Sequence, residues 1–131
     1  MTTRTASCRC GQLSVTVEGE PGRISVCHCL TCQQRSGSAF AAQARWPNDK
    51  VATSGNSKQW SYVGQSGGKA TFSFCPDCGS DVFYVLDKME GVTAVPIGAF
   101  QDPTFPSPNF SVWESRKHRW VEIVGDDIEH D

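Results

Sequence analysis

Hydrophobic and polar residues alternate along several short stretches of the chain. Leu13, Val15 and Val17 occupy every second position, and Phe72 and Phe74 do so within ATFSF. A period of two places alternate side chains on one face, so each stretch predicts a half-buried β-strand. Further strands are expected at 24–26, 39–46, 60–63, 82–86 and 93–97, separated by Gly, Asn, Asp or Pro. The pattern predicts a mainly β domain with antiparallel sheets.

The segments between these strands carry little helical pattern. The best short candidate is the turn from Thr31 through Arg35, where Thr31 is expected to cap the first free N–H groups. Segment 64–69 (GQSGGK) predicts a hairpin loop. Segment 102–108 (DPTFPSP) contains three prolines, which lack amide hydrogens, so it should run extended outside any sheet interior. The acidic tail DDIEHD is expected to fray.

Length and composition limit the classes of protein that this chain can be. Its 131 residues correspond to one domain, 1–131, and 38% hydrophobic content with 12 glycines predicts a modest core that needs further support. The formal charge of −2 lacks the basic footprint of nucleic-acid binders. No stretch approaches the roughly 20 apolar residues of a membrane helix, and the N-terminal segment lacks a signal peptide's apolar region. We therefore expect a cytoplasmic protein that binds neither nucleic acid nor membrane.

The seven cysteines fall into three closely spaced groups. These are Cys8 and Cys10; Cys27, Cys29 and Cys32; and Cys75 and Cys78. A reducing cytosol disfavours disulfides, and an odd number cannot pair completely, so metal thiolates are the better explanation. A C-x-C pair on an extended segment points both thiols to one side, which sends the intervening His28 to the other. The C-x-x-C pairs favour the tight turns typical of zinc knuckles.

The number of cysteines predicts two zinc sites of different character. A structural zinc needs four protein ligands, whereas a catalytic zinc has three and an open position. Seven cysteines divide into one set of each kind. Spacing alone leaves the division open, because Cys29, Cys32, Cys75 and Cys78 would form a plausible zinc ribbon and leave Cys8, Cys10 and Cys27.

Four segments, CRCG, CHCLTCQQRSGSAF, FCPDCGS and SVWESRKHRW, together resemble the glutathione-dependent formaldehyde-activating family. The resemblance covers nearly the whole chain and implies a single domain with the Mss4-like fold. It also implies two zinc ions per chain. The structural zinc would be held by Cys8, Cys10, Cys75 and Cys78, and the catalytic zinc, which accepts a substrate thiolate, by Cys27, Cys29 and Cys32.

A zinc ion held by three thiolates limits the chemistry that is expected. Its net charge of −1 makes it a weaker Lewis acid than a histidine-ligated zinc, so hydrolysis is disfavoured. The zinc deaminase signature H-x-E is missing, since Leu30 follows His28 and Cys29. Such a zinc lowers the pKa of an incoming thiol instead. We expect a carbon–sulfur lyase or synthase acting on the adduct of a glutathione-like thiol and formaldehyde or a related small electrophile, with the second zinc site partly empty on isolation.

An anionic thiol needs cationic groups near the second site, since two occupied zinc sites would lower the formal charge to about −5. Arg35, Ser36, Gly37 and Ser38 directly follow the second-site cysteines and are expected to bind substrate. The basic segment 116–119, flanked by Trp113 and Trp120, could serve the same end, although a charged edge strand is its simpler interpretation.

Two other functions are compatible with these motifs. The alternative is a non-catalytic zinc-containing module that binds a thiol or a protein, because the same fold also occurs without catalytic activity. A redox switch at Cys29 and Cys32 is disfavoured, since the chain lacks the βαβ pattern expected beside a thioredoxin-like C-x-x-C.

Overall fold

The computed structural model describes residues 2–64 and 67–131. The strands in these ranges are β1 (Thr3–Ser7), β2 (Ser14–Glu18), β3 (Arg23–Cys27), β4 (Ala41–Pro47), β5 (Val51–Ser54), β6 (Lys58–Val63), β7 (Lys69–Phe74), β8 (Asp81–Leu86), β9 (Val92–Pro96), β10 (Phe110–Val112) and β11 (Glu129–His130). The helical segments are α1 (Leu30–Ser36) and three 3-10 turns, η1 (Asn48–Lys50), η2 (Ile97–Phe100) and η3 (Glu114–Arg116).

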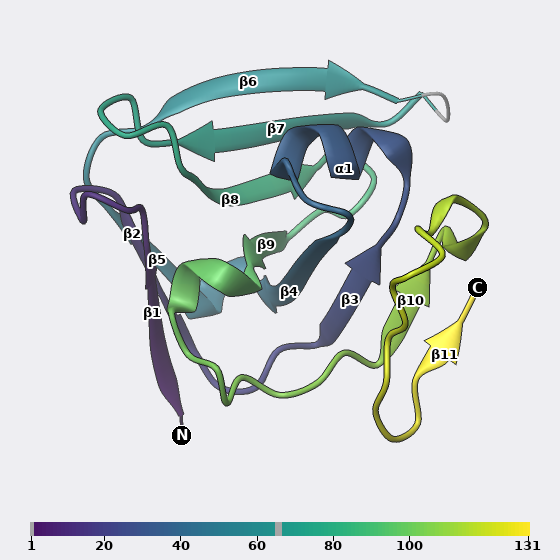
Figure 1. The fold of residues 1–131 in the computed structure, drawn as a ribbon. Helices are drawn as coiled ribbons and strands as arrows, with labels where there is room; N and C mark the ends of the chain where they lie inside the picture. The colour runs from purple at the N-terminus through teal and green to yellow at the C-terminus, as the bar shows by residue number, and fades with distance from the viewer. Residues whose placement is uncertain (1, 65–66) are drawn as a thin grey trace.

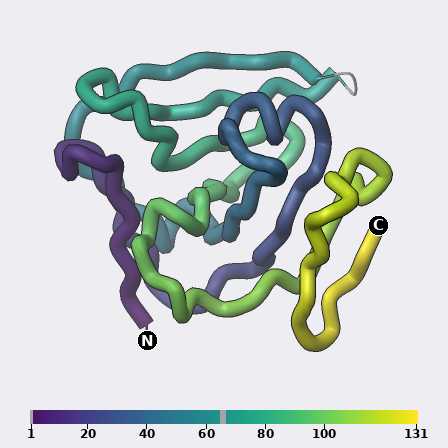
Figure 2. Tube along the Cα trace, viewed as in Figure 1, coloured from purple at the N-terminus to yellow at the C-terminus, as the bar shows by residue number. Residues whose placement is uncertain are grey.

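The strands form two sheets. One has three strands in the order β1-β2-β5, and the other has eight in the order β11-β10-β3-β4-β9-β8-β7-β6. Figure 1 shows β6, β7 and β8 across the top of the molecule, β3 and β4 below them, and α1 drawn in front of β7 and β8. Figure 2 follows the same path as a tube and places the chain ends on opposite sides. The prediction of a mainly β, antiparallel fold is confirmed.

The core lies where the small sheet packs against the large one. The alternating residues Leu13, Val15 and Val17 are fully buried, as their period of two predicts. They pack with Trp46 of β4, whose indole N–H donates to the Gly19 carbonyl at 3.0 Å. Two cysteines of the predicted structural site, Cys8 and Cys75, belong to the same buried cluster.

Three details differ from the sequence expectation. Cys29, not Thr31, caps α1, because its sulfur accepts the Cys32 amide hydrogen. The tail does not fray, since β11 pairs in parallel with β10, which pairs in parallel with β3. The basic segment at 116–119 is not an edge strand. It follows η3 and contacts α1, where Gln33 donates to the Arg116 carbonyl at 3.1 Å.

Both expected connections lie outside the strands, except that Lys69 is already the first residue of β7. Segment 64–69 joins the antiparallel pair β6 and β7, although residues 65 and 66 lie outside the described ranges. The proline-rich segment 102–108 runs between η2 and β10 without strand pairing. No helix in the described parts of the chain has the length and apolar character needed to cross a bilayer.

Candidate functional site

The first cysteine cluster joins two turns that are far apart in sequence. Cys8 and Cys10 lie between β1 and β2, Cys75 and Cys78 lie between β7 and β8, and all four sulfurs are within 4.8 Å of one another. The Cys10 sulfur is 3.6 Å from that of Cys8 and 3.7 Å from that of Cys75. Tetrahedral zinc with Zn–S bonds near 2.3 Å requires about 3.8 Å between sulfurs, whereas a disulfide requires about 2.05 Å. The cluster therefore fits a metal ion.

Two tight turns aim these sulfurs inward. The Gly79 amide donates to the Cys75 carbonyl at 2.8 Å, and the Gly11 amide donates to the Cys8 carbonyl at 3.1 Å. Both glycines have positive φ, 80° and 88°, a conformation that other residues adopt only with strain. The glycine after each cysteine pair is thus required by the turn.

Hydrogen bonds to sulfur favour the thiolate forms of Cys75 and Cys78. The pKa of Cys10 is instead raised to about 12, because the bond from the Gln12 amide, which lowers it, is outweighed by hydrogen bonds with the other three thiols. The Leu13 amide donates to the Cys8 sulfur at 3.3 Å, and the Gln12 side chain donates to the Cys75 sulfur at 3.0 Å. A hydrogen bond with the Ser80 side chain, together with bonds from the Cys10 and Ser80 amides, lowers the pKa of Cys78 to about 5. Donors around a sulfur stabilise its charged form, which is the form that binds metal.

The second cluster is built where β3 runs into α1. Cys27 ends the strand, Cys29 caps the helix and Cys32 lies in its first turn, with the three sulfurs within 4.8 Å of one another. His28 contributes no atom to this cluster. Its ring is buried and its Nε2 lies 3.0 Å from the Ser111 hydroxyl of β10, on the other side of the strand.

The thiols of the second cluster shift one another's pKa values in opposite directions. A hydrogen bond with Cys27 lowers the pKa of Cys32 to about 6, and Cys29 and the Arg35 cation act in the same direction. The same hydrogen bond and burial raise the pKa of Cys27. Three soft sulfur donors, with no fourth protein ligand among the described residues, suit a zinc ion with an open position.

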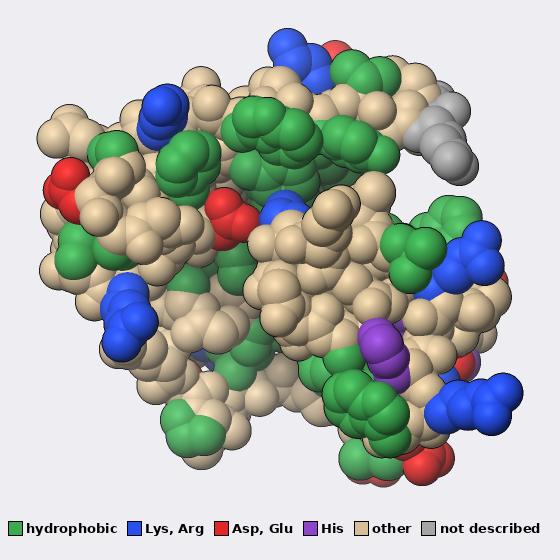
Figure 3. All heavy atoms as spheres, turned by 45° about the horizontal axis from the view of Figure 1, so that its top comes forward, with side chains coloured by type: hydrophobic (Ala, Val, Ile, Leu, Met, Phe, Trp, Pro, Cys, Tyr) green, Lys and Arg blue, Asp and Glu red, His purple; other side chains and the backbone are tan. Residues whose placement is uncertain are grey.

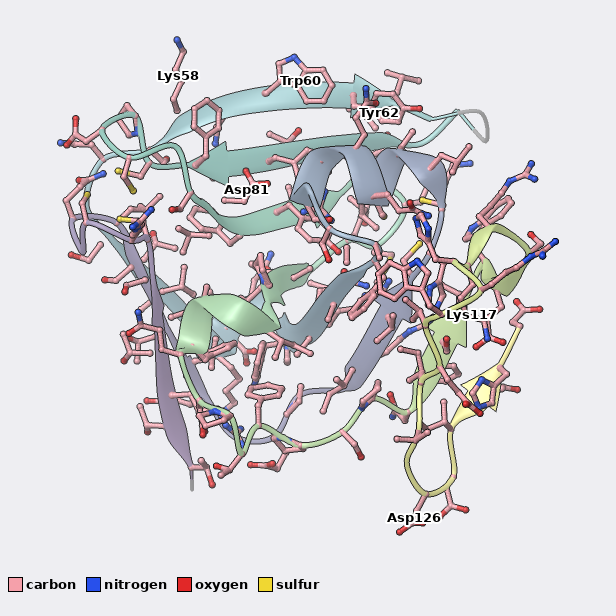
Figure 4. The ribbon with its side chains drawn as sticks, in the orientation of Figure 1. Lys58, Trp60, Tyr62, Asp81, Lys117 and Asp126 are labelled. Atoms are coloured by element: carbon pink, nitrogen blue, oxygen red, sulfur yellow. The ribbon has the colours of Figure 1, made fainter. Side chains whose placement is uncertain are left out.

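A cavity of about 850 Å³ opens onto this second cluster, at Cys27 and Cys32. Figure 3 shows a hollow with hydrophobic side chains along its upper rim and acidic and basic side chains together inside it. One side is an aromatic wall formed by Trp60, Tyr62, Phe72 and Tyr84. Figure 4 shows Trp60 and Tyr62 on β6 and Asp81 on β8. The wall thus comes from strands that are remote in sequence from the cysteines.

Arg35 lies in this cavity, as a substrate-binding role requires. Its guanidinium is 4.8 Å from the Phe72 ring centroid and 3.6 Å from the Asp81 carboxylate. Burial raises the pKa of Asp81, although Arg35 opposes this. The aromatic face and the carboxylate hold the cation next to Cys32, with its side chain 17% exposed.

The three residues after Arg35 lie elsewhere. Ser36, Gly37 and Ser38 are not among the described residues that line the cavity. Gly37 ends α1 with a φ of 66°, and its amide donates to the Gln33 carbonyl. The Ser36 hydroxyl accepts the Ser38 amide hydrogen at 3.2 Å. Their polar groups are used in closing the helix, and their predicted role in substrate binding stays a prediction.

Sequence reasoning missed most of the cavity lining. Asp81, Tyr84, Trp60 and Arg45 face it from strands that contain no cysteine, and Arg23 faces it from the start of β3, four positions before Cys27. One signal was present, because charged residues interrupt strands that are otherwise apolar or small. Only the strand pairing shows that such residues share one cavity.

Comparison with known proteins agrees with this geometry. Residues 3–116, which include all seven cysteines, match a family model described as glutathione-dependent formaldehyde-activating enzyme. A crystal structure of a Rhodobacter sphaeroides protein, a structural genomics target, is similar with a TM-score of 0.60 and 20% identity over 76% of this chain and 91% of that chain. That likeness shows a shared fold. A search of curated proteins found no match. By its family match, the chain belongs to the glutathione-dependent formaldehyde-activating enzyme family.

Proposed function

We propose that the protein is a zinc-dependent carbon–sulfur lyase or synthase that forms and cleaves the adduct of a glutathione-like thiol with formaldehyde or a related small electrophile. Family membership supports a formaldehyde-activating, glutathione-related function. The observation that carries the proposal is the second cluster: three cysteine sulfurs within 4.8 Å that open onto a cavity large enough for a small-molecule thiol.

The two clusters would have different tasks. Cys8, Cys10, Cys75 and Cys78 would hold a structural zinc, and Cys27, Cys29 and Cys32 a catalytic one. When bound at the second cluster, zinc supplies a positive charge that keeps a substrate thiol deprotonated at neutral pH. The three cysteines would provide a soft, electron-rich ligand set that favours binding of a substrate sulfur and disfavours the generation of hydroxide.

The reaction that follows is balanced without an oxidant or reductant. The thiol enters the cavity and releases its proton to water, and its sulfur adds to the carbonyl carbon of the aldehyde. A C–S bond forms while the C=O π bond opens, and the oxygen takes a proton from water. The product is the S-hydroxymethyl adduct, and the reverse sequence cleaves the C–S bond. Holding the thiol and the aldehyde together in the cavity converts a bimolecular reaction into an effectively unimolecular one.

Arg35 would assist by offsetting negative charge. It lies beside Cys32 in the cavity, and its cation already lowers the pKa of that thiol. A positive charge at this place favours both the cluster thiolates and an anionic substrate. Tyr84 would remain protonated, because burial raises its pKa to about 12, so it adds no negative charge to the cavity.

The test is NMR exchange spectroscopy on an equilibrium mixture of glutathione, formaldehyde and their adduct. Catalytic amounts of the zinc-loaded protein should speed interconversion in both directions, and Cys29→Ser should abolish the acceleration. Unchanged exchange, together with measurable thiol binding, would contradict catalysis. That result would favour the alternative of a non-catalytic thiol- or protein-binding module, because a binder shifts concentrations only in proportion to its own amount.

A further inference from the structure

The wall of the cavity formed by β3 and β4 contains two arginines that the cysteine chemistry does not use. The strands pair so that Arg23 lies opposite Arg45 and Ser25 lies opposite Gln43. Arg23, Ser25 and Cys27 occupy alternate positions of β3, so they share one face, and all three line the cavity. Arg23 and Cys27 therefore face the same cavity from the two ends of β3, and Arg45 lies opposite Arg23 on β4.

Buried polar atoms of Arg23, Arg45 and Gln43, at the end of the cavity away from the cysteines, lack hydrogen-bond partners. The Nε–H groups of Arg23 and Arg45 are buried with no acceptor. Gln43, only 4% exposed, donates from Nε2 to the Ser25 hydroxyl at 2.8 Å, which leaves its buried Oε1 without a donor. Each unsatisfied buried group costs free energy, and native proteins pair nearly all of them. The two unpaired Nε–H donors therefore indicate an acceptor on a ligand, whereas the Gln43 Oε1 would need a donor.

Charge gives a second, independent indication. Arg23 and Arg45 are directly opposite like charges, an arrangement that destabilises a sheet. Across the described residues 2–64 and 67–131, neither guanidinium has a carboxylate partner, and the cavity carboxylate, Asp81, pairs with Arg35. Burial and the neighbouring Arg23 lower the pKa of Arg45. The uncompensated positive charge requires an anion.

A ring contact holds the Arg23 guanidinium in place, and Arg45 extends from a central strand. Arg23 lies over the Phe110 ring, 4.0 Å from its centroid, which fixes the planar group by a cation–π contact. Arg45 is anchored on β4 between strands β3 and β9 at the middle of the sheet. A pair of arginines on rigid strands is prearranged for the two oxygens of a carboxylate.

We propose that Arg23 and Arg45 form the anion-binding end of this cavity and hold a carboxylate of the thiol ligand whose sulfur lies at Cys27 and Cys32. The inference rests on the proposed function and adds the residues that hold the carboxylate of a thiol that carries one several bonds from its sulfur. Cys27 is four positions from Arg23 along β3, about 13 Å between their backbones, and the long arginine side chains shorten the gap. Short neutral thiols would reach only one end.

The test compares two thiols of the same length on the zinc-loaded protein by calorimetry. Mercaptohexanoate carries the carboxylate, and mercaptohexanol carries a neutral hydroxyl instead. We expect the wild type to bind mercaptohexanoate about tenfold to hundredfold more tightly, the effect of a hydrogen bond to a charged group. Arg45→Gln and Arg23→Gln should each remove most of this preference and leave mercaptohexanol binding unchanged. Equal affinities of the wild type for the two thiols would overturn the proposal.

Matched controls separate binding from structure. Arg119→Gln removes one exposed cation outside the cavity and should retain the full preference. Arg45→Gln relieves repulsion with Arg23, so its melting temperature should equal or exceed that of the wild type. If Arg45→Gln is less stable and keeps the preference for mercaptohexanoate, the arginine has a structural role and the proposal is wrong.

A third ligand distinguishes failure of this inference from failure of the proposed function. The S-methyl ether of mercaptohexanoate keeps the carboxylate but has no ionisable thiol. If the thiol and the ether bind equally and both weaken in Arg45→Gln, the anion-binding end stands and the proposed thiol chemistry fails. The opposite result is that both thiols bind with equal affinity, that both bind more tightly than the ether, and that Arg45→Gln leaves these affinities unchanged. In that case the thiol site stands and the anion-binding end fails.

Discussion

The two cysteine clusters use the same ligand atoms in different surroundings. The four-cysteine cluster joins two turns across 65 residues of sequence, and two of its members, Cys8 and Cys75, lie in the hydrophobic core with exposures of 2% and 0%. The three-cysteine cluster is local, spans residues 27–32 and borders a cavity of about 850 Å³. A metal in the first cluster would cross-link the fold, whereas one in the second would face a ligand.

The comparison also shows how cysteine position determines accessibility. The first pair of turns is closed by left-handed glycines and packed against both sheets. The second cluster uses the end of β3 and the first turn of α1, where one side remains open. Only 38% of the chain is hydrophobic and its core is modest, so we expect a metal in the first cluster to support the fold and the second cluster to be free to serve chemistry.

The largest effect is expected from removing a ligand of the core cluster. Cys75→Ser should give unfolded or insoluble protein, because structural zinc contributes about 10–16 kcal/mol in small peptides, as much as the total stability of a typical domain. Zinc content and thermal unfolding would check this. A soluble variant with two zinc ions per chain and an unchanged melting temperature would refute the structural assignment.

The matched change in the open cluster should leave the fold intact. Cys29→Ser is expected to lower zinc content from two ions per chain to one and to abolish thiol binding, with an unchanged circular dichroism spectrum. Mild chelation of the wild type should do the same, because the site has one protein ligand fewer. Unfolding in step with loss of the first zinc ion would show that the two clusters are not distinct.

A smaller effect is expected at Arg35, which lies beside the open cluster but holds no metal. Arg35→Gln should reduce the rate of catalysed exchange by about tenfold, since a charge-assisted contact contributes roughly 1.5–3 kcal/mol. Zinc content should stay at two ions per chain. The control is Arg119→Gln, which removes the same charge outside the cavity. Equal rates for wild type and Arg35→Gln would remove Arg35 from substrate binding.

The smallest effect is expected at the pair Glu114 and His130, which belongs to neither cluster and does not line the cavity. Their side chains lie 2.6 Å apart, and hydrogen bonds from Ser111 and His130 hold the pKa of Glu114 below its usual 4.5. Since the folded-state pKa is lowered, the contribution to stability is complete above pH 4.5 and is lost as pH falls through the folded-state pKa.

At neutral pH, Glu114→Gln should therefore cost less than about 1 kcal/mol, because solvent screens this exposed pair. Thermal unfolding would measure the loss, and zinc content should remain at two ions per chain. Loss of metal from this variant would mean that the C-terminal strand supports a cluster after all.

Local patterns were sufficient for much of this description. The period of two at 13–17 and 72–74 depends on neighbouring residues alone, so it predicted β2 and β7 without knowledge of the fold. The count and spacing of the cysteines indicated two sites for the same reason. The cap of α1 and the paired C-terminal tail were missed, because the sulfur of Cys29 and the edge of β10 act as partners only in the folded chain.

Tertiary structure decided which cysteines meet and what the open cluster faces. Spacing allowed a ribbon of Cys29, Cys32, Cys75 and Cys78, yet the pairing of the strands brings Cys8 and Cys10 to Cys75 and Cys78 instead. Arg23 and Arg45 are 22 positions apart and became neighbours only through the register of β3 with β4. Such long-range pairings depend on packing over the whole chain. Strand periodicity and cysteine spacing depend only on residues that are close in sequence.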